Sequence, residues 1–295
     1  MARSHPPTLI TLVSRCLREE CAVTRGSRVL LALSGGGDSM ALLHVLALLS
    51  KKQGYSLSAH GVDHGLRPEA AAELDAAEAA CRALDVAFSR TVLAVAPGGN
   101  LQARARDARR EALSAAAARV GADRIATAHH ADDRAETVLL RLLRGAGPRG
   151  LSVLPPRVGH WIRPQCRARK ADITAHLTRH RLTFAQDPSN LDQRYLRTRV
   201  RHEVVPLLEQ LSPQIVSHLC ALADALAADG EGEPPVLIDE RGVALLLNRA
   251  QRQLVGRART LGQRSARVSL PQGRELGLDP VTLQPVLVAA RPRKR

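Results

Sequence analysis

A short glycine-rich segment, Ser34-Gly35-Gly36-Gly37-Asp38-Ser39, constrains this chain more than any other part of its sequence. The apolar run at 28–33 before it is typical of a buried strand, and the apolar run at 40–49 after it is typical of a buried helix. Glycines between a strand and a helix allow positive φ and bring consecutive N–H groups to one anion, which the positive helix end also attracts. The segment therefore predicts a phosphate-binding loop.

The residues around these glycines exclude two common phosphate loops. A Walker loop needs Gly-Lys followed by Ser or Thr, and the chain contains no Gly-Lys pair. A dinucleotide-binding fingerprint needs a third glycine at the position of Met40. The carboxylate of Asp38 would repel phosphates unless a divalent cation bridges the two, so we expect Mg²⁺ at Asp38, while Ser34 and Ser39 add hydroxyl donors.

Charge and cysteine usage narrow the class of protein. A formal net charge of +15 over 295 residues favours a nucleic-acid partner, because Lys and Arg that neutralise phosphates release counterions; an Arg-rich coding bias is the alternative source. Five cysteines without a C-x-x-C pair are typical of reduced thiols, and no apolar run approaches a membrane span. We therefore expect a cytoplasmic protein that does not associate with membranes.

The order of apolar runs predicts the fold. Candidate strands at 56–62, 86–92 and 124–128 alternate with candidate helices at 69–84 and 101–120. This alternation is typical of an α/β protein in which helices cover both faces of a doubly wound parallel sheet. Ligands of such folds bind at the carboxyl ends of the strands, which is where the glycine loop is expected.

A second polar block begins where the 124–128 strand ends. It contains His129, His130, Asp132, Asp133 and Glu136, and the apolar spacing after it predicts a helix that ends before Gly145. The carboxylates could ligate a metal, bind a cationic substrate, or cap the helix. Because they are expected at the same sheet edge as the phosphate loop, we favour a binding role.

The region 163–211 is basic and has a helical pattern, interrupted by a predicted turn at Asp187-Pro188-Ser189-Asn190. Four arginines follow this turn: Arg194, Arg197, Arg199 and Arg201. They could hold phosphates or form a solvated face, and the sequence leaves both alternatives open. Beyond a predicted linker at 229–235, short β-like runs around Leu237, Leu246 and Val286 precede the basic tail 291–295.

The glycine loop resembles the SGGxDS loop of the ATP pyrophosphatase, or PP-loop, superfamily. Further blocks stand in the order seen in bacterial tRNA(Ile)-lysidine synthetases: Asp63-His64-Gly65-Leu66-Arg67, Ala105-Arg106-x-x-Arg109, the segment 129–137 with Arg144-Gly145-Ala146-Gly147 after it, and Asp187-Pro188-Ser189-Asn190. The chain is similar to this family over roughly 27–211. It departs from the usual pattern at Gln102, Arg110 and Thr198, where Glu, Tyr and Asn are common.

This resemblance implies a reaction: ATP and free L-lysine convert the wobble cytidine of CAU-anticodon tRNA(Ile) into lysidine through an adenylated cytidine. It also implies site residues, with ATP at Ser34, Gly35, Gly36, Gly37, Asp38 and Ser39 and with Mg²⁺ at Asp38. The implied lysine site is Asp133 and Glu136, and the implied tRNA contacts are Arg194, Arg197, Arg199 and Arg201. The implied catalytic residues are Asp38, Arg106, Arg109 and Arg201.

The extent of this resemblance and the linker-like composition at 229–235 together predict three parts of the chain: an ATP pyrophosphatase catalytic domain with a helical extension at 1–211, a helix and linker at 212–235, and a small basic C-terminal α+β domain at 236–295. The fold expected of the first part is adenine-nucleotide α-hydrolase-like. The oligomeric state stays open, with a homodimer as one alternative.

Three other functions remain open at this point. A tRNA cytidine thiolase shares the loop and the basic surface, but this chain lacks the C-x-x-C pair that would hold sulfur or a cluster. An ATP-dependent amidotransferase or NAD synthetase would use ammonia or glutamine and ignore tRNA. A non-enzymatic RNA-binding module is less favoured, because charge alone does not require the ordered serine, glycine and aspartate residues of the loop.

Overall fold

The structure is a computed structural model that describes residues 7–63, 65, 69–93, 101–185 and 196–230, together with five short strands after residue 230. For residues 101–103 and 228–230 and for these five strands, we describe only the backbone. The chain forms two compact units, 1–226 and 227–295. The predicted blocks at 66–68, 98–100 and 186–195 lie outside the described residues, as do His64 and the tail 291–295. No helix in the described part is long and apolar enough to span a membrane.

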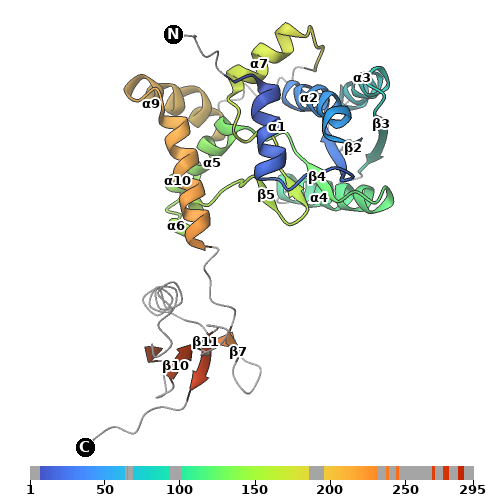
Figure 1. The fold of residues 1–295 in the computed structure, drawn as a ribbon. Coiled ribbons are helices and arrows are strands. Elements are labelled where there is room, and N and C mark those ends of the chain that lie inside the picture. Colours follow the sequence, from blue (N-terminus) through green and yellow to red (C-terminus); the bar gives the residue numbers. More distant parts are fainter. Residues whose placement is uncertain are drawn as a thin grey trace, which may run out of the picture. The chain divides into compact units, whose positions relative to one another are not determined.

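A six-stranded sheet forms the centre of the first unit (Figure 1). Its strands are β1 (Arg28–Leu33), β2 (Ser56–Asp63), β3 (Ala87–Val92), β4 (Arg124–Ala126), β5 (Arg157–Val158) and β6 (Trp161–Ile162). Their order is β3-β2-β1-β4-β6-β5, and every neighbouring pair is parallel except β5 and β6. The order reverses between β1 and β4, and open α/β sheets bind ligands at such a reversal.

The predicted doubly wound α/β fold is confirmed by the two layers of helices. Helices α1 (Leu9–Glu19), α2 (Gly37–Gln53), α3 (Glu69–Ala83) and α7 (Lys170–Arg179) contribute buried side chains to one core, together with alternate residues of β1. Helix α4 (Leu101–Arg119) packs on the opposite face, where Leu30 and Ala32 of β1 meet Leu113 and Ala116. Successive residues of β1 therefore point into different cores, as a strand that is buried on both faces requires.

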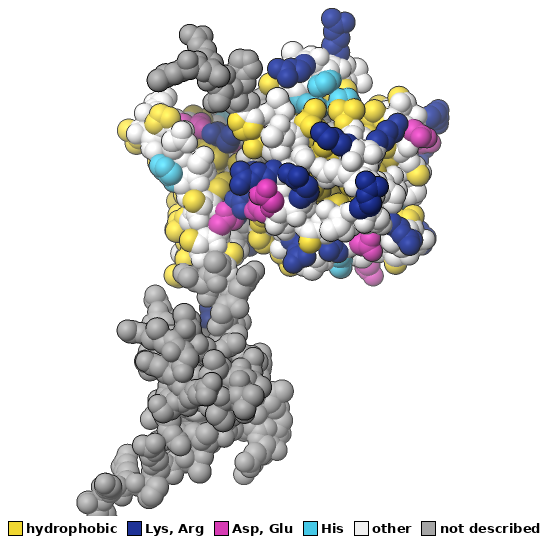
Figure 2. Space-filling view, in the orientation of Figure 1, with side chains coloured by type: hydrophobic (Ala, Val, Ile, Leu, Met, Phe, Trp, Pro, Cys, Tyr) yellow, Lys and Arg dark blue, Asp and Glu magenta, His cyan; other side chains and the backbone are white. Residues whose placement is uncertain are grey.

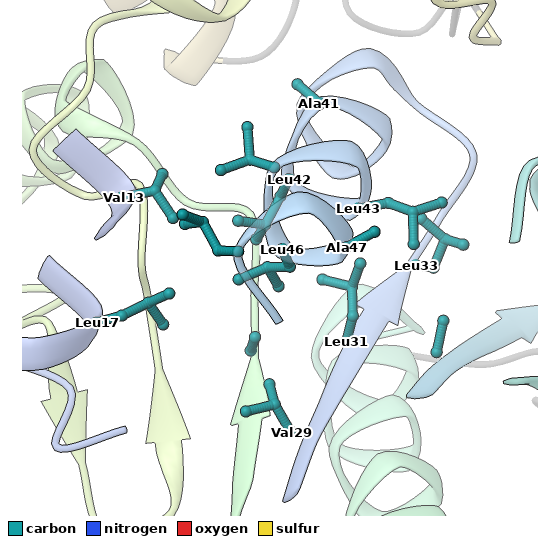
Figure 3. Packing of buried hydrophobic residues seen from close by; sticks show 14 of the residues in the cluster. Val13, Leu17, Val29, Leu31, Leu33, Ala41, Leu42, Leu43, Leu46 and Ala47 are labelled. Atoms are coloured by element: carbon teal, nitrogen blue, oxygen red, sulfur yellow. The ribbon is translucent and has the colours of Figure 1, made fainter. Parts of the chain in front are cut away.

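Helix α2 is apolar on nearly every side because it is enclosed by its neighbours. Figure 3 shows Leu42, Leu43 and Leu46 of α2 between the side chains of α1 and those of β1. Each fully buried leucine contributes about 1.5–3 kcal/mol to folding. This packing fixes the N-terminal end of α2, where the glycine loop lies.

A helical extension forms a second core within the same unit. It consists of α5 (Ala131–Leu143), α6 (Pro148–Leu151), α8 (Leu196–Arg199), a π-helical turn (Val200–Val204), α9 (Val205–Leu211) and α10 (Ile215–Gly230). Figure 1 shows α9 and α10 beside α5. The guanidinium of Arg134, which is wholly buried, donates from Nη2 to Oδ1 of Asp224 at 2.7 Å and thereby links α5 to α10.

The second unit contributes five described strands. These are β7 (Leu237–Ile238), β8 (Ala244–Leu245), β9 (Val268–Ser269), β10 (Glu275–Leu278) and β11 (Pro285–Val288). They form a two-stranded antiparallel pair, β7-β8, and a three-stranded antiparallel sheet, β11-β10-β9. The predicted division at 211 and 235 stays a prediction.

Two helix predictions were wrong at their first residues. Helix α2 begins at Gly37 rather than at Met40, because Gly36 is its N-cap and the carbonyl of Gly36 accepts the first N–H bonds. The segment 163–169 is not helical: the N–H of Cys166 bonds the carbonyl of Arg163 at 3.1 Å in a turn, and the helix begins at Lys170. The sequence analysis did not predict α1, α6, β5 or β6.

Candidate functional site

A cavity of about 1270 Å³ opens at the carboxyl ends of β1 and β4, where the strand order reverses. The glycine loop after β1 and residues 127–129 after β4 line it, and so do residues of α4 and α7. The sequence predicted that the loop and the histidine block would meet at one edge of the sheet. The cavity brings the loop together with His129, which confirms this part of the prediction.

Gly35 is the residue that determines the shape of the loop. It has φ +80°, and a Cβ at this position would lie 2.8 Å from the carbonyl oxygen of Glu73, so only glycine fits. Gly36 has φ −72°, and a Cβ there would approach only the hydroxyl of Ser34 at 3.7 Å. Of the three glycines, Gly35 alone uses the positive φ that glycine allows, because Gly36 and Gly37 serve as helix cap and first helical residue.

The two serines of the loop hold it closed. Their hydroxyl oxygens lie 3.1 Å apart, and the N–H of Ser34 donates to Oγ of Ser39 at 3.3 Å. The hydroxyl of Ser39 in turn donates to the carbonyl of Gly36 at 2.8 Å. Both serines line the cavity, so they can also contact a ligand there.

Gln165 connects the loop to the end of β4, and the sequence analysis missed it. Its side chain is wholly buried, and Nε2 donates to the carbonyl of Asp38 at 3.2 Å and to that of Ala128 at 2.7 Å. The residue follows Pro164 in a segment expected to be helical, so no sequence pattern marked it. Its two hydrogen bonds fix the spacing between two walls of the cavity.

Positive charge dominates the cavity. Asp38 is the one acidic side chain among the described residues that line it, and it forms an ion pair with Lys170 of α7. The cationic lining side chains are Arg106, Arg109, Arg110, Arg141, Arg163, Lys170, Arg181 and Arg197. Figure 2 shows that basic side chains are also more frequent than acidic ones on the drawn face of this unit. Such a cavity suits a polyanion such as a nucleoside triphosphate or an RNA backbone.

Asp38 has the chemistry that a magnesium site needs. Its side chain is about one-third exposed (35%), and it lies in the first turn of α2 among groups that could hold phosphates. Mg²⁺ is usually held by one or two carboxylates together with the phosphate oxygens of its substrate. A single carboxylate in a cationic cavity fits that pattern, so the residues present are compatible with Mg²⁺ bound jointly by Asp38 and ATP.

Helix α4 supplies free cations to the cavity. Arg106 is exposed and Arg109 is half-buried, and neither forms an ion pair with a described residue. Burial lowers the pKa of Arg109, but a guanidinium remains charged at neutral pH. Cζ of Arg110 lies 5.1 Å from the ring centroid of Trp161, so the guanidinium stacks on the aromatic face. Arg110 stands where the family usually has Tyr, and the sequence analysis did not single out Trp161 as its partner.

Asp133 and Glu136 lie behind Arg197 instead of lining the cavity directly. Glu136 is only 2% exposed; its Oε2 accepts from Nε of Arg197 at 3.0 Å and its Oε1 from Nε of Arg201 at 2.6 Å. Asp133 Oδ1 accepts from Nη2 of Arg197 at 3.0 Å, and its Oδ2 accepts from the backbone N–H of His130 at 3.1 Å. The two carboxylates therefore form one buried site with two arginines, and Asp133 also caps α5.

His130 joins the phosphate loop to this carboxylate pair. Its Nε2 lies 3.8 Å from Oδ2 of Asp38 and 3.5 Å from Oδ2 of Asp133. Burial lowers the pKa of His130, but the carboxylates of Asp132, Asp133 and Asp38 outweigh burial and raise it. The predicted ATP site and the predicted lysine site are therefore adjacent.

The contacts of Asp132 hold two segments of the fold together. Its Oδ1 accepts from Nη2 of Arg169 at 2.9 Å, and its Oδ2 accepts from the backbone N–H of Lys170 at 2.7 Å. Although burial alone would raise its pKa, the neighbouring His130 and the hydrogen bonds from Arg169 and the Lys170 N–H hold the pKa of Asp132 well below its usual range. Asp132 thus joins the start of α5 to the start of α7.

The remaining predicted arginines have different surroundings. Arg199 is exposed and donates to Glu203 one turn later, with its Nη2 2.9 Å from Oε2 of Glu203. Arg201 is held by Glu136, as described above, and is about one-third exposed (35%). Arg194 lies outside the described residues. Only Arg197 of this group lines the cavity among the residues that the structure describes.

Comparisons with known proteins agree with this geometry. The sequence profile of a family described as PP-loop domain matches residues 10–208. A protein of Aromatoleum aromaticum named tRNA(Ile)-lysidine synthase is 42% identical over 203 residues, which are 67% of this chain and 47% of that protein. A protein of the same name from Symbiobacterium thermophilum is 41% identical over 212 residues, which are 68% of this chain and 44% of that protein. The chain thus spans about half the length of the curated relatives it matches.

A solved structure has the same fold. The U34-tRNA thiolase NcsA from Methanococcus maripaludis, which was solved with its [4Fe-4S] cluster, superposes with a TM-score of 0.61 and 19% identity. The superposition covers 74% of this chain and 79% of that chain. At this identity the likeness concerns the fold alone.

Proposed function

Because this chain belongs to the PP-loop domain family, we propose that it uses ATP to join L-lysine to the wobble cytidine of a CAU-anticodon tRNA(Ile), which forms lysidine. The observation that carries the proposal is the position of His130, whose Nε2 lies within 4 Å of both Asp38 and Asp133. A phosphate loop and a carboxylate pair side by side suit a reaction that consumes ATP and a cationic amine. Relatives about 40% identical and named tRNA(Ile)-lysidine synthase support the choice of substrates.

In the first step we assign ATP to the glycine loop. Backbone N–H groups at the start of α2, the hydroxyls of Ser34 and Ser39, and Lys170 would hold its phosphates. The cytosine O2 attacks the α-phosphorus, the bond to the β-phosphate oxygen breaks, and pyrophosphate leaves. Mg²⁺ held by Asp38 would supply charge neutralisation on the leaving phosphates.

Arg106 and Arg109 are the residues that we assign to the adenylated cytidine. Both line the cavity without an acidic partner among the described residues, so their charge is available to a phosphate. Cations aimed at developing negative charge stabilise a transition state more than a ground state. The target base must also leave the anticodon stack to reach this enclosed position.

In the second step we assign the lysine ε-ammonium to Asp133 and Glu136. Because Arg197 shields these carboxylates and is 47% exposed, we propose that it moves aside and that the ammonium takes over its contacts with Glu136. The ammonium passes a proton to this carboxylate pair, its nitrogen bonds to C2 of the cytosine, and the C2–O bond breaks so that AMP leaves with the electron pair. Arg201, which stays on Glu136, would keep the carboxylate in place.

The tRNA backbone would contact the same edge of the unit. We assign Arg194, Arg197, Arg199 and Arg201 to phosphate contacts, with Arg197 reaching the backbone when it leaves Glu136. The three substrates, ATP, free lysine and tRNA, are all available in the cytoplasm, where we place the reaction.

Labelled lysine tests this function. The protein is incubated with labelled L-lysine, ATP and Mg²⁺, with transcripts of tRNA(Ile) or elongator tRNA(Met) that share the CAU anticodon, and without RNA. We expect label in tRNA(Ile) only, and only with ATP. ATP consumption that needs ammonia or glutamine and no RNA would favour the amidotransferase, and sulfur transfer to cytidine without lysine incorporation would favour the thiolase.

A further inference from the structure

Three histidines meet on the side of α7 that faces α2. His44 belongs to α2, His176 lies in the last turn of α7, and His180 is the C-cap of α7. Nδ1 of His44 lies 3.0 Å from Nε2 of His176, and the ring centroids of His176 and His180 are 4.4 Å apart. None of the three is among the described side chains that line the nucleotide cavity.

The arrangement has the dimensions of a metal site. One ring nitrogen from each histidine lies within 4.8 Å of the other two, which no other group of His, Cys, Asp or Glu achieves among the described residues. A tetrahedral zinc ion with Zn–N bonds of about 2.0–2.1 Å would separate its nitrogen ligands by about 3.3–3.4 Å. The three side chains therefore need only small rotations to bind one ion.

The chemical state of the rings also suits a metal. Burial lowers the pKa of His44. Burial also lowers the pKa of His176, to about 4, and the neighbouring rings of His180 and His44 add to this effect. Neutral imidazoles offer the lone pairs that a transition metal needs. His176 is buried, His44 is half-buried and His180 is exposed, so an ion can enter from solvent.

We propose that His44, His176 and His180 form a binding site for one divalent transition-metal ion of the Zn²⁺ class, separate from the Mg²⁺ site at Asp38. Three histidine ligands leave the fourth tetrahedral position to water at the exposed side of His180. In the metal-free protein, the hydrogen bond between His44 and His176 places a proton where the ion would bind. The ion must displace that proton.

The site would cross-link two helices that border the nucleotide cavity. Helix α2 begins in the glycine loop, and Lys170, Thr174 and Thr178 of α7 line the cavity. A bound ion would hold these two walls together, because it binds the folded arrangement and not the unfolded chain. The expected effects are a higher unfolding temperature and tighter coupling of α7 to the loop.

Zinc titration of the full-length, tag-free protein tests the site. After removal of metals with a chelator, isothermal titration with ZnCl2 should give one ion per chain with a Kd in the micromolar range or below. His180→Gln and His44→Gln should each weaken the affinity at least tenfold. His218→Gln provides the matched control, because His218 is an exposed histidine of α10.

A second readout separates ligation from folding. Zn²⁺ should raise the unfolding temperature of the wild type and of His218→Gln but not that of His180→Gln, and Co²⁺ should give a tetrahedral absorption spectrum that His180→Gln loses. Since His180 is exposed, this variant should keep the circular dichroism of the wild type. Absence of zinc binding, or equal affinity in the wild type and His180→Gln, would overturn the proposal.

Discussion

Lys170 of α7 forms an ion pair with Asp38 in the first turn of α2, so the one acidic side chain that lines the described part of the cavity is already neutralised. Half of the Lys170 side chain is exposed (51%), which leaves it free to exchange partners. If ATP and Mg²⁺ bind as proposed, the side chain of Lys170 can turn to the phosphates and the carboxylate of Asp38 to the metal. This exchange keeps the charge of the loop balanced with and without nucleotide.

Replacement of Asp38 should separate binding from turnover. Asp38→Asn keeps the size of the side chain and removes a half-exposed ion pair, so we expect a stability loss of no more than about 1 kcal/mol. ATP should still bind, because Lys170 and the backbone N–H groups remain, but lysine incorporation should fall at least 100-fold. Thermal unfolding, nucleotide titration and the labelled-lysine assay measure the three quantities. Near-normal lysine incorporation by the folded variant would contradict the assignment of Mg²⁺ to Asp38.

Glu136→Gln should affect lysine more than ATP. A neutral amide attracts the ammonium weakly, so we expect the KM for lysine to rise at least tenfold, while the KM for ATP changes less than about threefold. Glu203→Gln is the control, since it breaks another arginine pair at an exposed position. If both KM values rise together, or if only thermal stability falls, the carboxylate serves the fold of α5 and not the substrate.

Two alanine substitutions in the loop should differ. Gly35→Ala places a Cβ 2.8 Å from a backbone oxygen at φ +80°, so we expect a loss of about 1–3 kcal/mol in unfolding free energy together with weaker ATP binding. At Gly36 the backbone has φ −72°, and a Cβ would make only an ordinary contact with the Ser34 hydroxyl at 3.7 Å, so Gly36→Ala should cost less than about 1 kcal/mol. Urea unfolding compares them. Equal losses of unfolding free energy would mean that the positive φ and the close backbone contact at Gly35 do not require glycine.

His129 should make the protein sensitive to acid. Burial lowers its pKa from 6.5 to about 4, against the opposing charge of Asp133. Between pH 6.5 and about pH 4, His129 is therefore protonated in the unfolded chain but neutral in the folded chain. The free energy of unfolding should fall as the pH decreases through this interval. His129→Gln should lose less stability over this interval, which urea unfolding at several pH values measures. Parallel stability curves for the two proteins would exclude this role.

Much of the fold followed from local patterns. Buried β1 and the apolar α2 were predicted because a strand enclosed on both faces and a helix enclosed by its neighbours both leave continuous apolar runs. Helix α1 was missed, although its buried residues Leu9, Val13, Cys16 and Leu17 have helical spacing that could have indicated it. Strands β5 and β6 have two residues each, too few for any periodicity.

The site was predictable in its residue types but not in its partners. The spacing of Asp133 and Glu136 placed them on one helix face, yet no pattern indicated that Arg197 and Arg201, more than 60 positions later, would hold both. The same holds for Gln165 and Lys170, which reach the loop through tertiary packing. Contacts between distant segments depend on how the helices pack, which single-sequence periodicity does not contain.

Transfer of the AMP group to RNA is the most direct test of the proposed chemistry. The protein is incubated with tRNA(Ile) transcript, Mg²⁺ and ATP labelled at the α-phosphate, without lysine, and a parallel reaction uses ATP labelled at the γ-phosphate. We predict that only the α-label enters the tRNA and that added lysine releases it as AMP. Failure of the α-label to enter tRNA in a protein that binds ATP, or failure of lysine to release it, would contradict the account.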